Sequence, residues 1–197
     1  SFIEIIFFRI KHMLNRNSKK GSRKNIYAHY DIGNDFFQLW LDPTMTYSGA
    51  IFKKAEEDLS DAQGNKYENI LKKLNLKDGD HILEVGCGWG GFMEYAAKQG
   101  VKVTGVTISK EQYEFAKKRL SQYEGIAEVR LQDYREIKGE YSQIVSIEMF
   151  EALGKEYWNK YFKILHSILR PGGKMIIQSI TINNNDYNSY RRCSDFI

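Results

Sequence analysis

Short apolar runs alternate with amphipathic stretches through most of the chain. Apolar residues in continuous or alternating order predict strands at residues 81–85, 101–108, 127–133, 143–149 and 174–182. Apolar residues at helical spacing between them predict helices over residues 90–99, 110–123 and 156–169. Strands that alternate with single helices indicate a mainly parallel sheet with right-handed crossovers. We therefore predict an α/β, doubly wound, Rossmann-like fold.

The same pattern predicts part of the core and the position of the chemistry. In the last helix, an apolar stripe is expected to face the core: Trp158, Phe162, Leu165 and Leu169. In parallel sheets of this kind, ligands bind beyond the carboxyl ends of the strands. Candidate site residues are therefore expected in four segments, at 86–91, 107–112, 133–134 and 147–151.

The front of the chain differs from the rest. Residues 2–14 are densely apolar, and the stretch that follows is polar and basic. Residues 1–30 hold seven Lys or Arg and one acid, so the net charge of +4 is concentrated there. Two interpretations stay open for a helix at 1–24: packing on its own protein, or lying on an anionic membrane. A basic run without interleaved aromatics is weak evidence for nucleic acid, so no nucleic-acid partner is expected.

Composition narrows the class of protein. The length of 197 residues suits one domain with an appendage, and 42% hydrophobic with 27% charged residues is typical of a globular chain. No apolar run reaches the roughly 18 residues that a membrane span needs. Two cysteines exclude a disulfide scaffold and fit a reducing cytoplasm. No His/Cys cluster has zinc-ligand spacing, so no metal site is expected.

A glycine loop follows the first predicted strand of the sheet. Gly86, Gly88 and Gly91 form a G-x-G-x-x-G pattern between that strand and a helix, as in nucleotide-binding loops. NAD would require an acid at the end of the second strand, but residues 106–109 contain none. Glu84 precedes the first glycine by two residues, where a carboxylate suits the cationic amino-acid end of S-adenosylmethionine (SAM). The residues therefore favour SAM, while NAD and a purely structural role of the glycines stay open.

Six collinear stretches resemble one family. They lie at 29–36 (HYDIGNDF), 41–48 (LDPTMTYS), 85–91 (VGCGWGG), 105–112 (GVTISKEQ), 131–135 (LQDYR) and 146–151 (SIEMFE). They resemble the cyclopropane-fatty-acyl-phospholipid synthases, a group that includes the mycolic acid cyclopropane synthases, and the first two stretches are specific to it. The resemblance implies a class I methyltransferase fold. It also implies methyl transfer from SAM to the cis double bond of an unsaturated phospholipid acyl chain, with closure of a cyclopropane ring.

The resemblance assigns roles to individual residues. At the methionine end of the cofactor it implies Tyr47 and Ser48, together with the backbone of Gly86, Gly88 and Gly90. The ribose would be bound by the segment with Thr107, Ser109 and Gln112. The adenine would be contacted by Asp133 and Tyr134. For catalysis, Tyr30 would face the reacting carbons. Glu151 would hold a bicarbonate ion that acts as the base, and Ile180 would offer that ion a backbone amide.

Three positions depart from the family pattern. Gly49 replaces a cysteine, Gln178 replaces a histidine, and residues 151–154 read Glu-Ala-Leu-Gly in place of Glu-His-Val-Gly. Glutamine can donate a hydrogen bond but cannot carry a proton. The departures affect the bicarbonate site, so two alternatives to a ring stay open: a methylene- or methyl-branched product, and a non-catalytic paralogue that binds SAM and lipid. Glu148 is expected to be a negative charge at a helix N-terminus.

The resemblance also divides the chain. After the apolar and basic front segment at 1–24, it implies a helical lid region at 25–75 and a SAM-binding core at 76–197. A methyltransferase sheet normally has two strands after the last one predicted here, so we expect a fragment that shows no turnover alone, with an apolar edge at 174–182. For the whole protein the expectations are a cytoplasmic enzyme at the inner membrane surface, with a homodimer as a candidate assembly.

Overall fold

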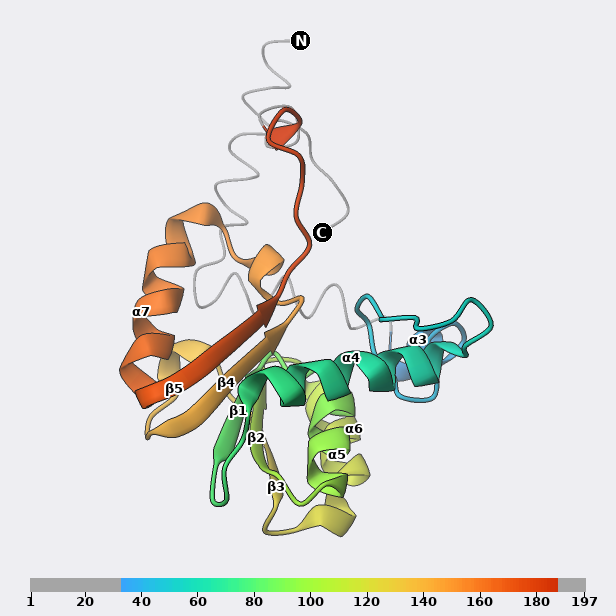
Figure 1. Cartoon of the computed structure of the whole chain (residues 1–197), viewed down its shortest axis with the longest axis horizontal. Coiled ribbons are helices and arrows are strands. Elements are labelled where there is room, and N and C mark those ends of the chain that lie inside the picture. The colour runs from blue at the N-terminus through green and yellow to red at the C-terminus, as the bar shows by residue number, and fades with distance from the viewer. Residues whose placement is uncertain (1–32, 188–197) are drawn as a thin grey trace.

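A single parallel sheet organises the chain. The computed structural model describes residues 33–187, and in this part five strands form the order β3-β2-β1-β4-β5 (Figure 1). The strands are β1 (His81–Val85), β2 (Lys102–Thr107), β3 (Ala127–Leu131), β4 (Tyr141–Ile147) and β5 (Leu169–Gln178). Every neighbouring pair is parallel. The predicted α/β fold with a mainly parallel sheet is confirmed.

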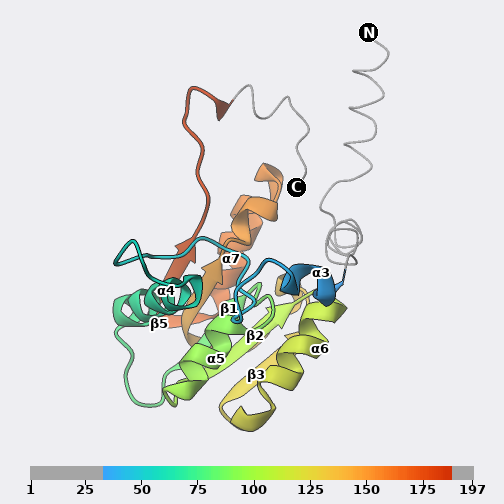
Figure 2. The ribbon, with the colours of Figure 1, turned by 90° about the vertical axis from the view of Figure 1, so that its right-hand side faces the viewer.

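Helices cover both faces of this sheet. They are α3 (Asn34–Gln38), α4 (Leu59–Leu74), α5 (Gly91–Lys98), α6 (Lys110–Arg119) and α7 (Trp158–Ile168), with 3-10 turns η1 (Ser121–Tyr123), η2 (Tyr134–Glu136), η3 (Phe150–Ala152) and η4 (Lys155–Tyr157). Figure 2 shows α5 and α6 in front of the strands. No helix within residues 33–187 combines the length and the apolar composition needed to cross a bilayer.

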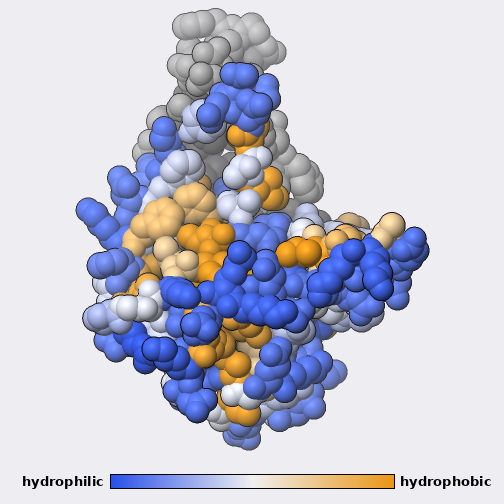
Figure 3. Space-filling model, in the orientation of Figure 1, coloured by the Kyte–Doolittle hydropathy of each residue, from blue (hydrophilic) through white to orange (hydrophobic). Residues whose placement is uncertain are grey.

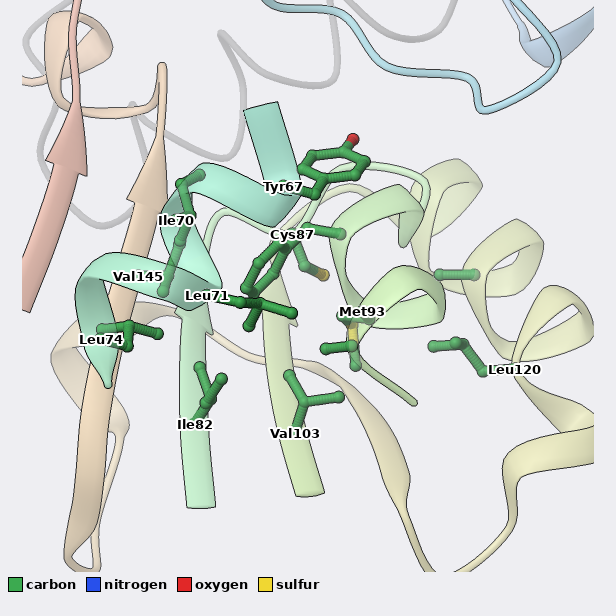
Figure 4. Packing of buried hydrophobic residues seen from close by; sticks show 13 residues of the cluster. Tyr67, Ile70, Leu71, Leu74, Ile82, Cys87, Met93, Val103, Leu120 and Val145 are labelled. Carbon is green, nitrogen blue, oxygen red and sulfur yellow. The ribbon is translucent and has the colours of Figure 1, made fainter. Parts of the chain in front are cut away.

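Each face of the sheet has its own apolar core, because side chains alternate along a strand. On one face, Ile82 of β1 and Val103 of β2 pack beneath α4 and α5, as Figure 4 shows with Leu71 and Met93. On the other face, Leu83 packs against α7. Glu84 therefore lies on the same side of β1 as Ile82, beneath α4.

Close packing of α5 on β2 depends on glycine at position 105, which has no side chain. A Cβ atom added at Gly105 would lie 2.2 Å from Sδ of Met93 and 2.8 Å from Cβ of Cys87. Any larger residue would push the helix away from the strand. The glycine thus fixes the distance between β2 and α5, whose first residue follows the glycine loop.

Two sequence predictions about helices were wrong in detail. The buried stripe of α7 is Tyr161, Leu165 and Ile168, and the predicted core residue Phe162 is 40% exposed. Both sets recur at helical spacing, and the helix is rotated so that Phe162 instead packs on Phe150, with ring centroids 5.4 Å apart. Helix 110–123 also ends earlier, at Arg119.

The last strand begins and ends before its predicted limits of 174–182. β5 starts at Leu169, because a register shift against β4 takes up the Pro-Gly-Gly turn at 171–173. It ends at Gln178, so Ile180 lies beyond it. β5 forms one edge of the described sheet, and Met175 and Ile177 are half-buried there. Figure 3 shows hydrophobic side chains over the end of β5, beside the polar surface of α4.

Candidate functional site

The carboxyl ends of the strands bring the candidate residues to one edge of the sheet. Glu84 lies near the end of β1, Thr107 ends β2, and Gln178 ends β5. Asp133 follows β3, and Glu148 follows β4. Because parallel strands end at the same edge, residues far apart in the sequence share this site.

The glycine loop needs backbone conformations that other residues rarely adopt. Gly86, Gly88 and Gly90 have φ values of 80°, 52° and 82°, all in the left-handed region. A Cβ atom at Gly86 would lie 2.6 Å from Cγ of Met149. At Gly88 an added Cβ would meet nothing within 4 Å, so the backbone of the loop is open to a ligand there.

Glu84 is a buried carboxylate with one unused oxygen. The residue is 3% exposed, and its Oε2 atom has no hydrogen-bond partner within residues 33–187. Burial raises the pKa of Glu84 well above its usual value, while the positive charge of Lys66 opposes that rise. An unpaired buried carboxylate is costly unless a ligand completes it. The α-ammonium group of SAM is a cation of the type that this oxygen would accept.

The predicted ribose residues form one buried network. Thr107 Oγ1 donates to Gln112 Oε1 at 2.8 Å, and the Ser109 amide donates to Thr107 Oγ1 at 3.2 Å. Ser109 Oγ accepts from the amide of Gln112 and caps α6. The network fixes the start of α6 at the edge of the sheet. Its contact with ribose stays a prediction.

The predicted adenine residues are already engaged within the protein. Asp133 is fully buried, and its carboxylate accepts from Nε of Arg135 at 2.8 Å and from Nη2 at 2.6 Å. This carboxylate raises the pKa of the Arg135 guanidinium. Tyr134 is buried against Tyr161, with ring centroids 5.1 Å apart. Asp133 would therefore share an existing ion pair with adenine, a role that stays a prediction.

Helix α4 holds the predicted methionine-end segment in place. Nε2 of Gln63 donates to the carbonyl oxygen of Ser48 at 2.8 Å, and Nζ of Lys66 donates to Ser48 Oγ at 2.6 Å. Tyr47 is 43% exposed, and its ring lies 5.1 Å from that of Trp40. Our sequence analysis missed Gln63 and Lys66. The available signal was two polar residues three positions apart, a spacing that places both on one face of a helix.

Lys66 is a buried cation in the middle of this site. It is 1% exposed, and desolvation lowers its pKa from 10.5 to about 8, although the negative charges of Glu148 and Glu84 oppose this. Its ammonium also donates to the carbonyl oxygen of Gly49 at 2.9 Å. A lysine in this setting fixes the 48–49 backbone and adds positive charge beside two glutamates.

Glu148 is the main site residue whose role the sequence did not indicate. Its Oε1 atom accepts from the Gly49 amide at 2.9 Å and from Nε2 of Gln178 at 2.8 Å. It lies just before the cap of η3, and its side chain turns toward these two donors, which the expectation of a charge at a helix N-terminus did not include. Its backbone φ of 46° is also left-handed, a conformation that surroundings must hold in a non-glycine residue.

The donors expected at the bicarbonate ion are occupied by protein carboxylates. The backbone amide of Ile180 donates to Oε1 of Glu151, and Ile180 itself is 66% exposed. The Gly49 amide and the Gln178 side chain both donate to Glu148. A bicarbonate ion therefore finds no free donor among Gly49, Gln178 and Ile180. The buried Oε2 atom of Glu151, which has no partner within residues 33–187, is an acceptor that this anion could meet only through its own hydroxyl group. Tyr30, the remaining catalytic candidate, and the segment at 1–24 lie outside the described residues.

Comparisons with known proteins match most of the chain. The family model described as mycolic acid cyclopropane synthetase matches residues 17–197. The tuberculostearic acid methyltransferase UfaA1 of Mycobacterium tuberculosis is 39% identical over 175 residues, which cover 84% of this chain and 41% of that protein. The cyclopropane-fatty-acyl-phospholipid synthase of Escherichia coli K12 is 40% identical over 178 residues, covering 89% and 46%. The chain thus spans less than half the length of these relatives.

Solved structures match the fold. Mycolic acid cyclopropane synthase CmaA1 complexed with SAH and CTAB has a TM-score of 0.79 and 36% identity, covering 86% of this chain and 60% of that one. Coclaurine N-methyltransferase, at 22% identity and a TM-score of 0.67, shares the fold alone. The described sheet and helices are therefore those of a class I methyltransferase.

Proposed function

The chain belongs to the mycolic acid cyclopropane synthetase family, and we propose that its protein is a SAM-dependent C-methyltransferase acting on unsaturated fatty acyl chains of phospholipids. The reacting group is a cis double bond, and the expected product is a cyclopropane ring. The observation that carries the cofactor is the buried, unpartnered Oε2 atom of Glu84 beside the glycine loop.

The residues of this chain would hold SAM at both ends. Glu84 would pair with its ammonium group, and the open backbone at Gly88 would allow close approach. Gln112 and Asp133 lie after β2 and β3, where the ribose and adenine are expected. When bound, SAM supplies an electrophilic methyl group on a cationic sulfur. An alkene is a poor nucleophile, so the protein must align the two groups and exclude water.

Exposed apolar side chains near this edge support a lipid substrate. Three side chains of α3 and the residues just after it are at least 43% exposed: Phe36, Leu39 and Trp40. Methylation of an alkene leaves a carbocation, which an aromatic face stabilises without capturing it. Tyr30 is proposed for that role. The basic front of the chain supports a position at an anionic membrane surface on the cytoplasmic side.

A branched product is the second candidate function. Gly49 and Gln178 both contact Glu148, so the base of this site is arranged differently from the one the family resemblance implies. Two relatives are named probable fatty acid methyltransferases, Rv3720 of Mycobacterium tuberculosis and a protein of Pseudomonas putida, and these names do not require a ring. Loss of a proton from the added methyl group after a hydride shift would give a methylene branch in place of a ring.

The test uses the protein at its full natural length, because the matched relatives are about twice as long as this chain. It is incubated with methyl-labelled SAM and liposomes of mono-unsaturated anionic phospholipid, and the released fatty acids are analysed by mass spectrometry. We expect label in the acyl chains, and fragmentation separates a ring from a branch. Intact SAM binding without labelled lipid would instead indicate another acceptor or a non-catalytic paralogue.

A further inference from the structure

Two departures from the family pattern meet at one atom. Gly49 and Gln178, at opposite ends of the described chain, both donate to Oε1 of Glu148, at 2.9 and 2.8 Å. A Cβ atom at position 49 would lie 3.3 Å from the same oxygen, so a larger residue there would crowd the carboxylate. The glycine, the glutamine and the glutamate therefore form a matched set.

The backbone also holds Glu148 in this position. Its amide donates to the carbonyl oxygen of Gln178 at 2.9 Å, so main chain and side chain both join the ends of β4 and β5. The ammonium of Lys66 donates to the other side of Gly49, at its carbonyl oxygen. The left-handed backbone of Glu148 is retained because these contacts over-determine it.

We propose that the Glu148 carboxylate, and not a bound bicarbonate ion, removes the proton from the methylated acyl chain. This inference rests on the proposed function. Oε1 of Glu148 already takes the Gly49 and Gln178 donors, and Glu151 takes the Ile180 amide, so no set of free donors is left for the ion. Within residues 33–187, Oε2 of Glu148 accepts no hydrogen bond and is available for a proton.

The proton transfer balances without any further reactant. A C–H bond of the added methyl group breaks, and its electron pair forms the bond to the cationic carbon that closes the ring. After a hydride shift, the same pair forms the double bond of a methylene branch. The proton passes to Oε2 of Glu148. Two hydrogen bonds on Oε1 hold the carboxylate in place and reduce its nucleophilicity, which favours proton removal over alkylation.

Three variants separate the roles of this carboxylate. Glu148→Gln keeps the shape and removes the base. Glu148→Gly opens the space between the donors, and glycine fits the left-handed backbone, so this variant is expected to fold. Glu140→Gln makes the first change at the exposed residue before the other end of β4 and serves as the matched control.

The first measurement does not depend on turnover. The full-length protein with bound SAH is titrated with carbon-13 bicarbonate and followed by NMR in buffer freed of carbon dioxide. We expect no binding to the wild type or to Glu140→Gln, and binding to Glu148→Gly. Saturable binding of bicarbonate to the wild type would overturn the inference, whatever the activity of the protein.

The second measurement is product formation from labelled SAM and lipid. Glu148→Gln is expected to lose at least about a hundredfold in rate, as for removal of a general base, with SAM affinity unchanged within about twofold. Wild-type turnover should not respond to bicarbonate, whereas Glu148→Gly should recover about tenfold when it is added. Full activity of Glu148→Gln would overturn the base role alone. Absence of labelled lipid from the wild type would overturn the proposed function, and the base role with it.

Discussion

The unpartnered Oε2 atom of Glu84 is the feature on which the proposed choice of SAM as cofactor rests. The carboxylate is buried, and burial raises its pKa, so the free protein holds Glu84 protonated to a higher pH than an exposed glutamate. The ammonium group of SAM favours the ionised form. Binding is therefore expected to release a proton from Glu84, and to weaken as the pH falls and the carboxyl becomes protonated.

Replacing Glu84 by glutamine tests this coupling. Glu84→Gln is expected to lower SAM affinity by about tenfold to a hundredfold, the cost of one charge-assisted hydrogen bond. Calorimetry in buffers of different ionisation enthalpy should detect proton release in the wild type and little in the variant. Glu140→Gln, far from the glycine loop in sequence, is the control. Equal affinity and equal proton release in Glu84→Gln would show that the ammonium group binds elsewhere.

Individual residues also mark what a sequence can reveal about a site. Glu84 could be proposed from the sequence because it stands two residues before the glycine motif. The role of Glu148 was not, because its partners Gly49 and Gln178 lie 99 and 30 residues away and meet it only in the folded chain. Its left-handed backbone has no signature in the sequence either. The role of a residue can be predicted from the sequence when its partners are close to it in the chain. It cannot be predicted in this way when the partners are brought together only by tertiary contacts.

Among the elements, the strands were the most predictable and α4 the least. The first predicted strand, 81–85, coincides with β1, because central strands of a parallel sheet are short apolar runs. α4 carries the buried polar residues Gln63 and Lys66 within its packed face, which obscures its amphipathic pattern. The stripe of α7 was misplaced because two neighbouring stripes of that helix are apolar, and packing selected one.

Two glycine substitutions test how closely these elements pack. Gly105→Ala would place a Cβ atom 2.2 Å from Sδ of Met93, between β2 and α5. The clash is expected to lower the free energy of unfolding by about 1–3 kcal/mol or more. Gly64→Ala, inside α4, would place its Cβ 3.8 Å from Tyr95, an ordinary contact, and should raise it by about 1 kcal/mol through helix propensity.

Urea unfolding of both variants, followed by circular dichroism, compares them directly. Both substitutions add one methyl group. An opposite sign of the change in the free energy of unfolding would therefore reflect the different surroundings of the two positions. If Gly105→Ala were as stable as the wild type, the close approach of α5 to β2 would not be needed for the fold. The distance that positions the glycine loop would then have another cause.

Across the described chain, the fold converges on one edge from segments that are remote in sequence. β1 brings Glu84, β4 and β5 bring Glu148 and Gln178, and α4 anchors the segment at 48–49 through Lys66. Strand alternation and the glycine loop were enough to predict the sheet and its functional edge. The pairing of carboxylates with donors at that edge depends on register and on α4, which the pattern of apolar residues does not encode.

A binding site assembled from so many elements should couple ligand binding to the stability of the entire fold. A ligand that binds only the folded state at 100 times its Kd adds about 2.7 kcal/mol, and each kcal/mol shifts the Tm of a domain of this size by roughly 2–4 °C. We therefore expect SAH to raise the Tm of the full-length protein by roughly 5–10 °C in a thermal unfolding scan. NAD at the same concentration should leave it unchanged, because no acid ends β2 to hold its ribose. Glu84→Gln should reduce the SAH shift without altering the Tm measured with NAD. A shift with NAD and none with SAH would overturn the choice of cofactor while leaving the fold intact.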